Sequence, residues 1–355
     1  MKLAHFDSLR PLCPLCVQRG TESPLVLTVR EVSTSTDVEF GVLRCPESAC
    51  ATEYPILRGI PILVANAAEF IAANIASLAA SDDLPPAASA LMGECAGAGS
   101  PFDSARQHLS TYAWDHYGDD EASAFDITPG CALRILDLAA NLNGISPTGN
   151  ALEMGCGVGG TALRLATHTS GLVLGIDLHV PMLRMAARTL ASGFAEYDLR
   201  QSGFLYRRVR RRVDISNAAR IDHWCCDATH PPFAPGTFST VVGLNVLDCV
   251  PSPLDLLTQT ERLLSPGGRF AFCTPYDWSP NATQPACWLG GHSPRGYFDG
   301  DPKAILEAVL TPGAHPASLA RLRRRASTDN VPWHVRTHDR GVMQYRLHMI
   351  TGEAV

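Results

Sequence analysis

A run of closely spaced glycines between a short apolar segment and a helical pattern constrains the fold of this chain more than any other feature. The run is NALEMGCGVGGTALRLATH, at residues 150–168. Leu152 to Met154 have the composition of a short buried strand, and TALRLATH has the periodicity of a helix. The glycines therefore fall on a strand-to-helix turn, where the missing side chains let the backbone come close to a ligand.

Strand-like and helix-like segments alternate after this turn. Three further apolar segments end in polar residues, which are Asp177, Asp227, Asn245 and Asp248, and a helix-like segment, a Pro-Gly-Gly turn and a fifth strand-like segment follow. Such alternation predicts an α/β fold with a parallel sheet, right-handed crossovers and helices on both faces. Ligands of such sheets bind at the carboxyl ends of the strands, where these polar residues are expected to lie.

In these segments the chain resembles the class I S-adenosylmethionine-dependent methyltransferases. The sequence E-x-G-x-G-x-G at residues 153–159 matches the first motif of that family, Asp177 matches its acidic second strand, and LLSPGGRF at residues 263–270 matches its turn after the helix. The resemblance implies a Rossmann-like sheet and S-adenosylmethionine as cofactor. A nicotinamide-dependent dehydrogenase is the alternative, but its third glycine normally follows at a G-x-x-G interval.

The same resemblance implies a set of cofactor-binding residues. Glu153 would orient the loop and the amino-acid end of the cofactor, Asp177 would bind the ribose, and Asp227 the adenine. Cys156 is expected to be a small packing residue rather than a nucleophile. The full expected set is Glu153, Gly155, Cys156, Gly157, Gly159, Asp177, Leu178, Asp227, Ala228 and, at the methionine portion, Asn245.

Four cysteines near the start of the chain form two close pairs. Cys13 and Cys16 lie in CPLC, and Cys45 and Cys50 lie in CPESAC. Four thiolates can occupy the corners of a tetrahedron, the geometry of structural zinc, and a metal would supply folding energy that a small unit lacks. Residues 1–65 are therefore predicted to be a separate zinc-binding unit. Four ordinary buried thiols are the alternative, because the second pair is spaced more widely than the first.

The end of this segment resembles a family of small zinc ribbons. Those ribbons end in a phrase like YPI-x-x-GIP, and residues 54–61 read YPILRGIP. The resemblance implies a scaffold that binds a protein partner, or a second copy of the chain as a homodimer, rather than a unit that carries out chemistry.

The chain between this unit and the glycine run is predicted to be mostly a connection. Residues 67–80 have a helix-like sequence, and the rest of residues 66–105 is rich in Ala, Pro and Gly and is predicted to be a linker. The methyltransferase-like domain is expected over residues 106–355. Near its start, Tyr112 lies in an aromatic-rich segment that is expected to be either a helix packed on the domain or a lid over a ligand.

An arginine-dense insertion interrupts this domain at about residues 193–219, with YRRVRRRVD at residues 206–214. One interpretation is a solvated helix face. The other is a segment that covers the site and pairs with a carboxylate of the substrate.

An aromatic connection, CTPYDWSPNATQPACWLGGH at residues 273–292, follows the fifth strand-like segment. It lies where the substrate side of this fold is expected. Tyr276, Trp278 and Trp288 could stack there on a flat or cationic substrate.

This connection and the tail VPWHVRTHDRGVMQY resemble the methyltransferase domain of ovothiol synthases, which methylates an imidazole nitrogen of a mercaptohistidine. That family has Pro-Tyr-x-Trp, Trp-Leu-Gly-Gly and Arg-x-His-x-Arg motifs, which here match residues 275–278, 288–291 and 336–340. The resemblance implies N-methylation of an imidazole or another heteroaromatic, histidine-derived small molecule. The expected substrate contacts are Tyr276, Trp278, Trp288, Arg336 and Tyr112.

Three residues are candidates for the chemistry itself. His292 and His338 are candidate proton acceptors, because histidine titrates in the useful pH range. Tyr276 is the third candidate. Asp277 and Arg295 are lesser candidates for orienting the substrate.

Composition limits the other functions. The net charge of −6 disfavours a protein that binds nucleic acid by charge. An RNA base methyltransferase is nevertheless an alternative, because ribosomal guanine methyltransferases also join a CPLC ribbon to this fold; S-methylation of a small molecule and a non-enzymatic scaffold are others. The chain shows no apolar run of signal-peptide or bilayer-spanning length, so a cytoplasmic protein without membrane contact is expected.

Overall fold

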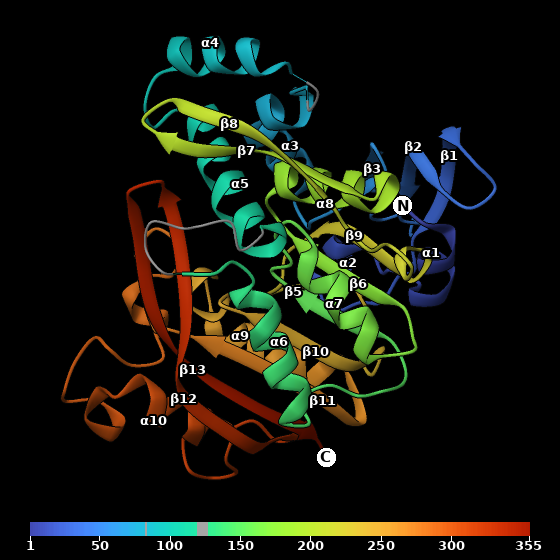
Figure 1. Ribbon diagram of the computed structural model, residues 1–355. Helices are drawn as coiled ribbons and strands as arrows, with labels where there is room; N and C mark the ends of the chain where they lie inside the picture. The colour runs from blue at the N-terminus through green and yellow to red at the C-terminus, as the bar shows by residue number, and fades with distance from the viewer. Residues whose placement is uncertain (82–83, 119–126) are drawn as a thin grey trace.

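The computed structural model describes residues 1–81, 84–118 and 127–355. Within these residues eleven strands form one mixed sheet (Figure 1). The strand order is β1-β2-β3-β4-β9-β6-β5-β10-β11-β13-β12. Its middle is parallel and consists of β4 Ile60–Leu63, β9 Ile221–Cys226, β6 Val173–Asp177, β5 Ala151–Met154, β10 Phe238–Leu244 and β11 Leu264–Thr274. The expected α/β class is confirmed.

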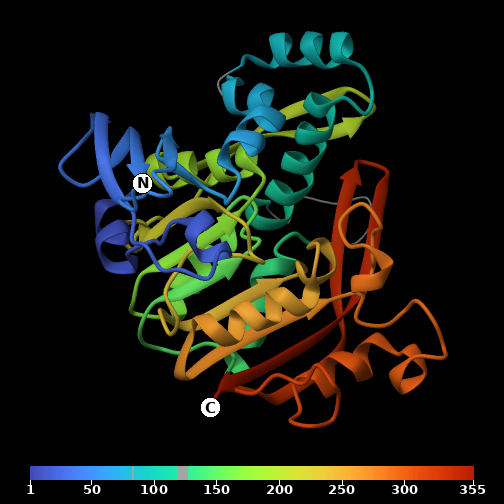
Figure 2. The same cartoon turned by 180° about the vertical axis from the view of Figure 1, so that it is seen from behind.

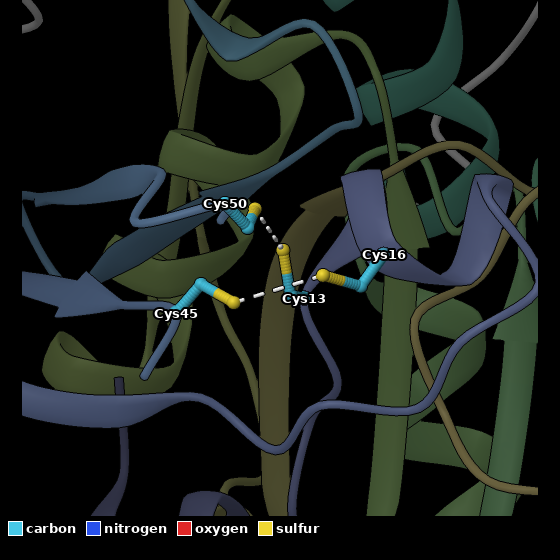
Figure 3. Close-up of side chains that lie close together, drawn as sticks. All are labelled: Cys13, Cys16, Cys45 and Cys50. Atoms are coloured by element: carbon cyan, nitrogen blue, oxygen red, sulfur yellow. Dashed lines mark hydrogen bonds between the residues drawn. The ribbon is translucent and has the colours of Figure 1, made fainter. Parts of the chain in front are cut away.

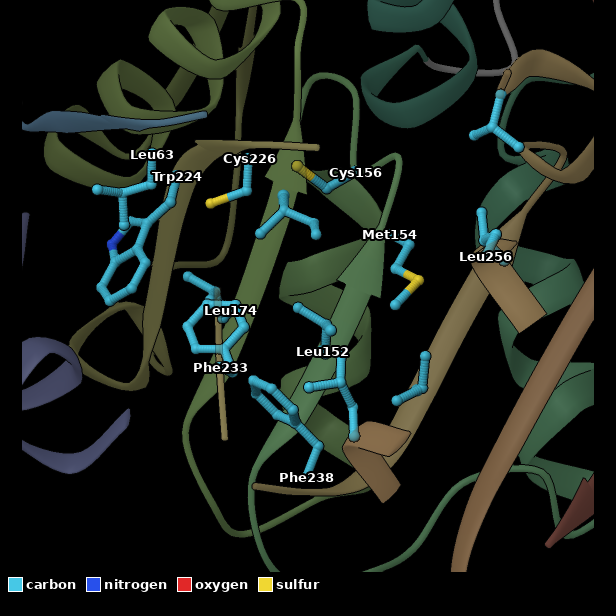
Figure 4. Packing of buried hydrophobic residues seen from close by; sticks show 14 of the residues in the cluster. Leu63, Leu152, Met154, Cys156, Leu174, Trp224, Cys226, Phe233, Phe238 and Leu256 are labelled. Carbon is cyan, nitrogen blue, oxygen red and sulfur yellow. The ribbon is translucent and has the colours of Figure 1, made fainter. Parts of the chain in front are cut away.

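Helices cover both faces of the parallel strands. The helices α6 Cys131–Asn141 and α7 Gly160–His168 lie on the face seen in Figure 1, and α9 Pro253–Leu263 lies on the face seen in Figure 2. The strands β5, β6, β9 and β10 between them are buried at almost every position, because both of their faces are covered. Figure 4 shows part of this core, which includes Leu152, Leu174, Trp224, Phe233 and Phe238.

The N-terminal unit continues this sheet instead of standing apart from it. Its elements are α1 Leu3–Leu9, α2 Pro14–Gln18, β1 Val26–Ser33, β2 Val38–Arg44, β3 Glu53–Leu57 and β4. In the parallel pairing of β4 with β9, Ile62 lies opposite Cys225 and Leu63 lies opposite Cys226. The unit therefore shares a sheet and an apolar core with the rest of the chain, because the apolar end of its sequence is buried against β9.

The connection after this unit is more helical than its composition predicts. The helix α3 Ala67–Ala79 confirms the helix expected there, but α4 Pro86–Ala96 lies where a linker was expected. Proline is well tolerated at the start of a helix and alanine favours helix, so this composition suits α4. The aromatic-rich segment is the helix α5 Pro101–Tyr117, where the Ser100 side chain accepts a hydrogen bond from the backbone N–H of Asp103.

The arginine-dense insertion is a β-hairpin of β7 Phe194–Ser202 and β8 Leu205–Arg212, so the helix interpretation is wrong. Arg208 lies opposite Asp198 in the hairpin register and binds it at 2.5 Å, and it binds Glu196 at 3.1 Å. In a strand, successive side chains point to opposite faces, and cross-strand ion pairs stabilise such a ladder. Part of the charge run is therefore paired within the hairpin, through Arg208 and, at 3.9 Å from Glu196, through Arg210.

A long C-terminal hairpin forms the other edge of the sheet. Its strands are β12 Leu322–His338 and β13 Gly341–Ala354, preceded by α10 Pro302–Val309, and β13 pairs with β11. The hairpin, red in Figure 1, extends to α5, where the Thr111 hydroxyl donates to the carbonyl of Arg336 at 3.0 Å. Across the part of the chain that the structure describes, no helix has the length and apolar character needed to cross a bilayer.

Asp222, in β9, connects the N-terminal unit to the sheet. Its Oδ2 atom accepts hydrogen bonds from the backbone N–H of Lys2 at 2.7 Å and from the indole N–H of Trp224 at 2.8 Å. The Asp222 side chain is almost completely buried, and Trp224 is completely buried. This carboxylate therefore satisfies two donors inside the contact between the two units.

Replacing Asp222 with alanine would leave both donors without their acceptor. We expect Asp222→Ala to lower the free energy of unfolding by about 3 kcal/mol, because two hydrogen bonds to a charged acceptor are lost. The matched control is Asp7→Ala, at an exposed position in α1. This variant should change the free energy of unfolding by less than about 0.5 kcal/mol. Chemical denaturation measures both variants, and equal stabilities would contradict this role of Asp222.

Candidate functional site

A cavity of about 410 Å³ lies at the carboxyl ends of β5, β6, β9 and β10, with α5 forming one wall. Its position agrees with the rule that ligands of parallel sheets bind at that edge. Most of the expected cofactor-binding residues line it: Glu153, Gly155, Gly157, Asp177, Leu178, Asp227, Ala228 and Asn245.

Two glycines keep the loop after β5 open toward this cavity. Gly155 has a φ of +75°, and a Cβ atom there would lie 2.8 Å from the Val246 side chain. Gly157 has a φ of +52°, and a Cβ atom there would lie 3.8 Å from Met182, at ordinary contact distance within the cavity. A side chain at either position would strain the backbone and fill space that a ligand needs.

Cys156 and Gly159, the other two expected cofactor residues, pack the loop instead of lining the cavity. Cys156 is completely buried, and a Cβ atom on Gly175 of β6 would lie 2.8 Å from its sulfur. A Cβ atom on Gly159 would lie 2.7 Å from both Ala186 and His223. The expectation that Cys156 is a small packing residue agrees with this geometry.

Asp177 ends β6 and is held by two backbone groups. Its Oδ2 atom accepts a hydrogen bond from the N–H of Gly157 at 2.9 Å, and its Oδ1 atom accepts one from the N–H of His179 at 2.8 Å. Burial raises the pKa of this carboxyl, and the two backbone hydrogen bonds oppose the rise. The group is thus fixed at the edge of the cavity, where it can accept hydrogen bonds from two adjacent hydroxyls.

Glu153 is the most strongly perturbed acid in the cavity. It is 2% exposed, and burial raises the pKa of its carboxyl to about 8. Its Oε2 atom has no hydrogen-bond partner among the described residues. Burying a carboxylate without a partner is costly, so a cationic or hydrogen-bond-donating ligand group would be favoured beside it.

Asp227, beyond the end of β9, is the third acid. Its Oδ1 atom accepts hydrogen bonds from the backbone N–H and the hydroxyl of Thr229, at 2.8 and 2.7 Å. Burial acts to raise the pKa of this carboxyl, but hydrogen bonds from His230 and Thr229 outweigh burial, and the pKa lies below its usual value. Asp227 is therefore an ionised acceptor at neutral pH.

Polar aromatic side chains spaced four residues apart on α5 form one wall of the cavity. They are His108, Tyr112 and His116, of which Tyr112 alone was an expected site residue. The Nδ1 atom of His116 accepts a hydrogen bond from the backbone N–H of Gly160 at 3.1 Å, and burial lowers the pKa of His116 to about 4. His116 is thus neutral at pH 7. The regular four-residue spacing was the signal that could have placed these rings on one helix face.

Trp333 also lines the cavity, although it comes from β12, far along the chain. It is 4% exposed, because β12 extends beside α5.

Asn245 has a φ of +55°, and its backbone N–H donates to the carbonyl of Cys273 at 2.9 Å. This bond holds the ends of β10 and β11 together beneath the cavity.

The aromatic connection after β11 packs largely on itself and on its neighbours. The Trp278 and Trp288 rings stack at 6.2 Å, and the Trp288 indole N–H donates to the carbonyl of Thr283 at 2.8 Å. The Tyr276 hydroxyl lies 2.6 Å from Nδ1 of His348. The three expected substrate-stacking rings lie outside the residues that line the 410 Å³ cavity.

The other candidates for substrate and proton handling are spread over the C-terminal region. His292 is exposed on a loop, as is Arg295, and His338 ends β12 with its Nδ1 atom accepting from the backbone N–H of Arg340 at 3.1 Å. The Arg336 guanidinium donates to Asp339 and, at 3.0 Å, to the carbonyl of Arg200. None of these side chains lines the cavity.

Asp277 lies next to another acid at the end of β11. Its backbone N–H donates to Oδ2 of Asp248 at 2.9 Å, and its own Oδ2 atom accepts from the Tyr345 hydroxyl at 2.9 Å. The expected position of Asp248 just beyond β10 is confirmed.

The four N-terminal cysteines converge, as Figure 3 shows. Their sulfur atoms all lie within 4.8 Å of one another, and the Cys13–Cys50 and Cys16–Cys45 pairs are 3.7 Å apart. Four sulfurs around a zinc ion at bond lengths of about 2.3 Å would be separated by about 3.8 Å. The four cysteines are free thiols, and their arrangement fits a tetrahedral metal ion.

Comparison with known proteins bears on the segment around the cavity. Residues 152–272 match a family model described as a methyltransferase domain. A stretch of 155 residues is 24% identical to 27-O-demethylrifamycin SV methyltransferase from Amycolatopsis mediterranei (strain S699). This stretch covers 44% of this chain and 48% of that protein. The chain therefore spans about half the length of this curated relative.

Solved structures give partial likenesses. An S-adenosylmethionine-dependent methyltransferase from Methanosarcina mazei aligns with a TM-score of 0.39 and 17% identity, over 61% of this chain and 97% of that chain. Phosphoethanolamine N-methyltransferase 2 from Haemonchus contortus, in complex with S-adenosyl-L-methionine, aligns with a TM-score of 0.33 and 20% identity, over 47% of this chain and 32% of that chain.

The family match and the cavity concern the same strands. Residues 152–272 run from β5 to β11 and contain the glycine loop, Asp177, Asp227 and Asn245. Residues 152–272 therefore form a class I S-adenosylmethionine-dependent methyltransferase domain.

Proposed function

We propose that this protein transfers a methyl group from S-adenosylmethionine to a small molecule, and that the acceptor is an imidazole or other heteroaromatic nitrogen of a histidine-derived metabolite. One observation carries the methyltransferase part of the proposal. The open backbone at Gly157 and the carboxylates of Glu153, Asp177 and Asp227 converge on one cavity at the carboxyl edge of the sheet.

The residues of the cavity fit the chemical groups of the cofactor. Asp177 can accept hydrogen bonds from the two ribose hydroxyls, and Asp227 can accept one from the adenine amino group. Oε2 of Glu153, which has no partner among the described residues, can accept one from the ammonium of the methionine end. When bound, the cofactor supplies a methyl group activated by its sulfonium.

The protein must also align the acceptor, exclude water and remove a proton. Tyr112, Trp333 and Val250 give the cavity an aromatic and apolar wall that suits a flat acceptor. Burial lowers the pKa of His108 in the same lining, so this imidazole is neutral at pH 7 and can accept a proton. The roles of His292, His338 and Tyr276 stay predictions, since these residues lie outside the lining.

The proposed class of methyl acceptor rests on the Pro-Tyr-x-Trp, Trp-Leu-Gly-Gly and Arg-x-His-x-Arg motifs and on the charge distribution of the chain. The tail that carries Arg336 and His338 also carries Trp333, which reaches the cavity. The arginine-dense hairpin gives an RNA substrate less support than its sequence suggests, because Arg208 is paired with Asp198 and Glu196 and is not free to bind a phosphate. The relative from Amycolatopsis mediterranei is named for a small-molecule substrate, which is consistent with this proposal.

Incubation with isotope-labelled S-adenosylmethionine and a panel of histidine, thiol-imidazole and RNA substrates tests the proposal. We expect label on a ring nitrogen of an imidazole compound, located by mass spectrometry. Label on sulfur or on RNA would refute the proposed acceptor. The absence of S-adenosylhomocysteine binding would refute the methyltransferase itself.

The Asp177→Ala variant tests the role of Asp177 in binding the cofactor. Loss of hydrogen bonds from the ribose to a charged acceptor should weaken cofactor binding by about 30-fold, or about 2 kcal/mol. Asp214→Ala, at an exposed position in the loop after β8, should leave cofactor binding unchanged. An unchanged cofactor affinity in Asp177→Ala would contradict the assigned role.

The raised pKa of Glu153 predicts a pH-dependent stability. The folded protein holds this proton more tightly than the unfolded chain, so stability falls as pH rises from about 4.5 to about 8 and then levels off. The glutamine in Glu153→Gln cannot ionise. The free energy of unfolding of this variant, relative to that of the wild type, should therefore increase by up to about 4 kcal/mol across that window.

Thermal unfolding from pH 5 to pH 9 measures this effect. Glu94→Gln, at an exposed position on α4, is the control and should follow the wild type at each pH. Saturating S-adenosylhomocysteine should shrink the advantage of Glu153→Gln, because the ligand ammonium favours the ionised carboxylate. A constant difference between Glu153→Gln and the wild type over the whole pH range would contradict the assignment.

The cysteine cluster is proposed to hold one structural zinc ion. The four sulfurs leave no open coordination position, so the metal would stabilise the N-terminal unit rather than act in the reaction. Ser23 and Tyr54 place hydroxyls 3.3 and 3.2 Å from the sulfurs of Cys45 and Cys13, which suits hydrogen bonds to thiolates.

Metal analysis of Cys16→Ser should show about one zinc ion lost per chain, together with a melting temperature lowered by several degrees. Cys95→Ser, at an exposed cysteine of α4, should keep both the metal and the melting temperature. If wild-type protein purified without chelator contains no zinc and chelator leaves its melting temperature unchanged, the cluster consists of four ordinary thiols.

A further inference from the structure

An exposed carboxylate, Asp277, lies beside a segment that forms part of the cofactor cavity. Its backbone N–H donates to Oδ2 of Asp248 at 2.9 Å. Asp248 belongs to the short 3₁₀ helix Leu247–Cys249, and both Cys249 and the following Val250 line the cavity. Asp277 is therefore attached to the wall that, in the proposed function, faces the methyl acceptor.

A second contact joins Asp277 to the C-terminal hairpin. Its Oδ2 atom accepts a hydrogen bond from the Tyr345 hydroxyl at 2.9 Å. Tyr345 lies directly opposite Trp333 in the register of β12 and β13, so the two side chains leave the same face of the hairpin. Trp333 lines the cavity. Asp277 is thus held between two segments that both contribute residues to the cavity.

A ligand can reach Asp277 more easily than it can reach Asp248. Asp277 is exposed, whereas Asp248 is 2% exposed and accepts the backbone N–H of Asp277. The two oxygens of a carboxylate can accept about four hydrogen bonds, so the bond from Tyr345 leaves Asp277 able to accept more. The Tyr345 hydroxyl also fixes the orientation of the carboxylate before a ligand binds.

The charges around the cavity favour a cation. In the described part of the chain, three acidic residues line the cavity and no lysine or arginine does. Burial raises the pKa of the Cys249 thiol in this lining to about 12, and the charges of Asp248 and Asp277 add to the rise. The charge of Asp277 therefore acts on a group inside the cavity. The field that opposes a thiolate there stabilises a positive group.

Aromatic rings supply further contacts that suit a cation. Tyr112 and Trp333 line the cavity, and Tyr345 packs in the same cluster as Trp333. The faces of such rings attract ammonium groups. A carboxylate beside them can add a charge-assisted hydrogen bond. A flat molecule that carries an ammonium group matches both features.

We propose that the methyl acceptor carries an ammonium group, that Asp277 binds this group, and that Tyr345 positions the Asp277 carboxylate. The inference rests on the proposed function, because it names the chemical class of the acceptor in that reaction as ring-bearing amines. An ammonium has no lone pair and is not the group that is methylated. Asp277 therefore holds the acceptor by its unreactive end and determines specificity.

Calorimetric titration of the full chain, saturated with S-adenosylhomocysteine, tests this inference with two pairs of probes. One pair is histamine and imidazole-4-ethanol, and the other is phenethylamine and 2-phenylethanol. The members of a pair differ only in an amine, which is protonated at pH 7, and a hydroxyl. We expect the wild type to bind the amine of each pair at least about tenfold more tightly than the alcohol.

Asp277→Asn removes the charge but keeps an oxygen that can accept from Tyr345. The amines should bind this variant about tenfold more weakly than the wild type, and the alcohols should bind both equally. Asp214→Asn is the matched control, because Asp214 is exposed and its carboxylate also accepts a hydrogen bond. It should keep the full preference for amines. Equal weakening of both members of a pair in Asp277→Asn would indicate a disturbed structure and would overturn the role of Asp277.

Tyr345→Phe tests the positioning role. The variant keeps the aromatic ring and removes the hydroxyl that holds Asp277. The preference for amines over alcohols should fall by about threefold, because the carboxylate remains but is no longer preorganised. An unchanged preference in Tyr345→Phe would show that Tyr345 does not position Asp277.

The two pairs of probes separate this inference from the proposed function. If the phenyl pair shows the preference and neither imidazole compound binds, the ammonium site stands and the imidazole acceptor fails. If the imidazole compounds bind equally well, the imidazole acceptor stands and the ammonium site is refuted. Absence of binding by both amines refutes the site as well.

The sulfonium of the cofactor is the other cation that Asp277 could serve. In that case Asp277→Asn would weaken binding of S-adenosylmethionine but not of the uncharged thioether S-adenosylhomocysteine, and it would leave the preference for amines intact. That result would overturn the inference. Equal affinity of the wild type and Asp277→Asn for S-adenosylmethionine, together with a lost preference for amines, is the expected result.

Discussion

The hydrogen bond from the backbone N–H of Gly157 to Asp177 is the interaction on which the cofactor cavity depends. It joins the loop after β5 to the acidic end of β6. The N–H groups of Gly155 and Cys156 add two bonds to the carbonyl of Ile176, at 2.8 and 3.1 Å. The open glycine backbone and the carboxylate therefore have a fixed relative position before any ligand binds, which is the preorganisation that a cofactor site requires.

Elements added at both edges of the sheet complete this site or support it. On one side, β4 pairs with β9, the strand that carries Asp227 at its end. On the other side, β13 pairs with β11, and its partner β12 brings Trp333 to the cavity. The contact between Thr111 and the carbonyl of Arg336 joins β12 to α5, so that the two walls of the cavity hold each other in place.

The central strands and the acidic residues at their ends could be predicted from the sequence because both are encoded locally. A buried parallel strand is an apolar run, and its carboxyl end lies next to the glycine turn or polar residue that follows it. Asp177, Asp227 and Asn245 therefore lie where they were expected. The convergence of the four cysteines was predictable for the same reason, since two short motifs carry them.

The features that sequence reasoning missed depend on pairing between distant segments. Nothing near Ile62 shows that it will lie beside Cys225, and nothing near Trp333 shows that β12 will reach α5. The arginine-dense segment was ambiguous because helices and hairpins both accept solvated charges, and the pairing of Arg208 with Asp198 appears only when the strands are aligned. Trp278 and Trp288 were expected to face a substrate, whereas in the structure they stack on each other.

A crystal structure of the protein with S-adenosylhomocysteine tests the central claim most directly. The account predicts the ribose hydroxyls within hydrogen-bond distance of Asp177, the adenine beside Asp227, and the amino-acid end at Glu153. A nucleoside bound elsewhere, or a ribose that does not contact Asp177, would contradict it.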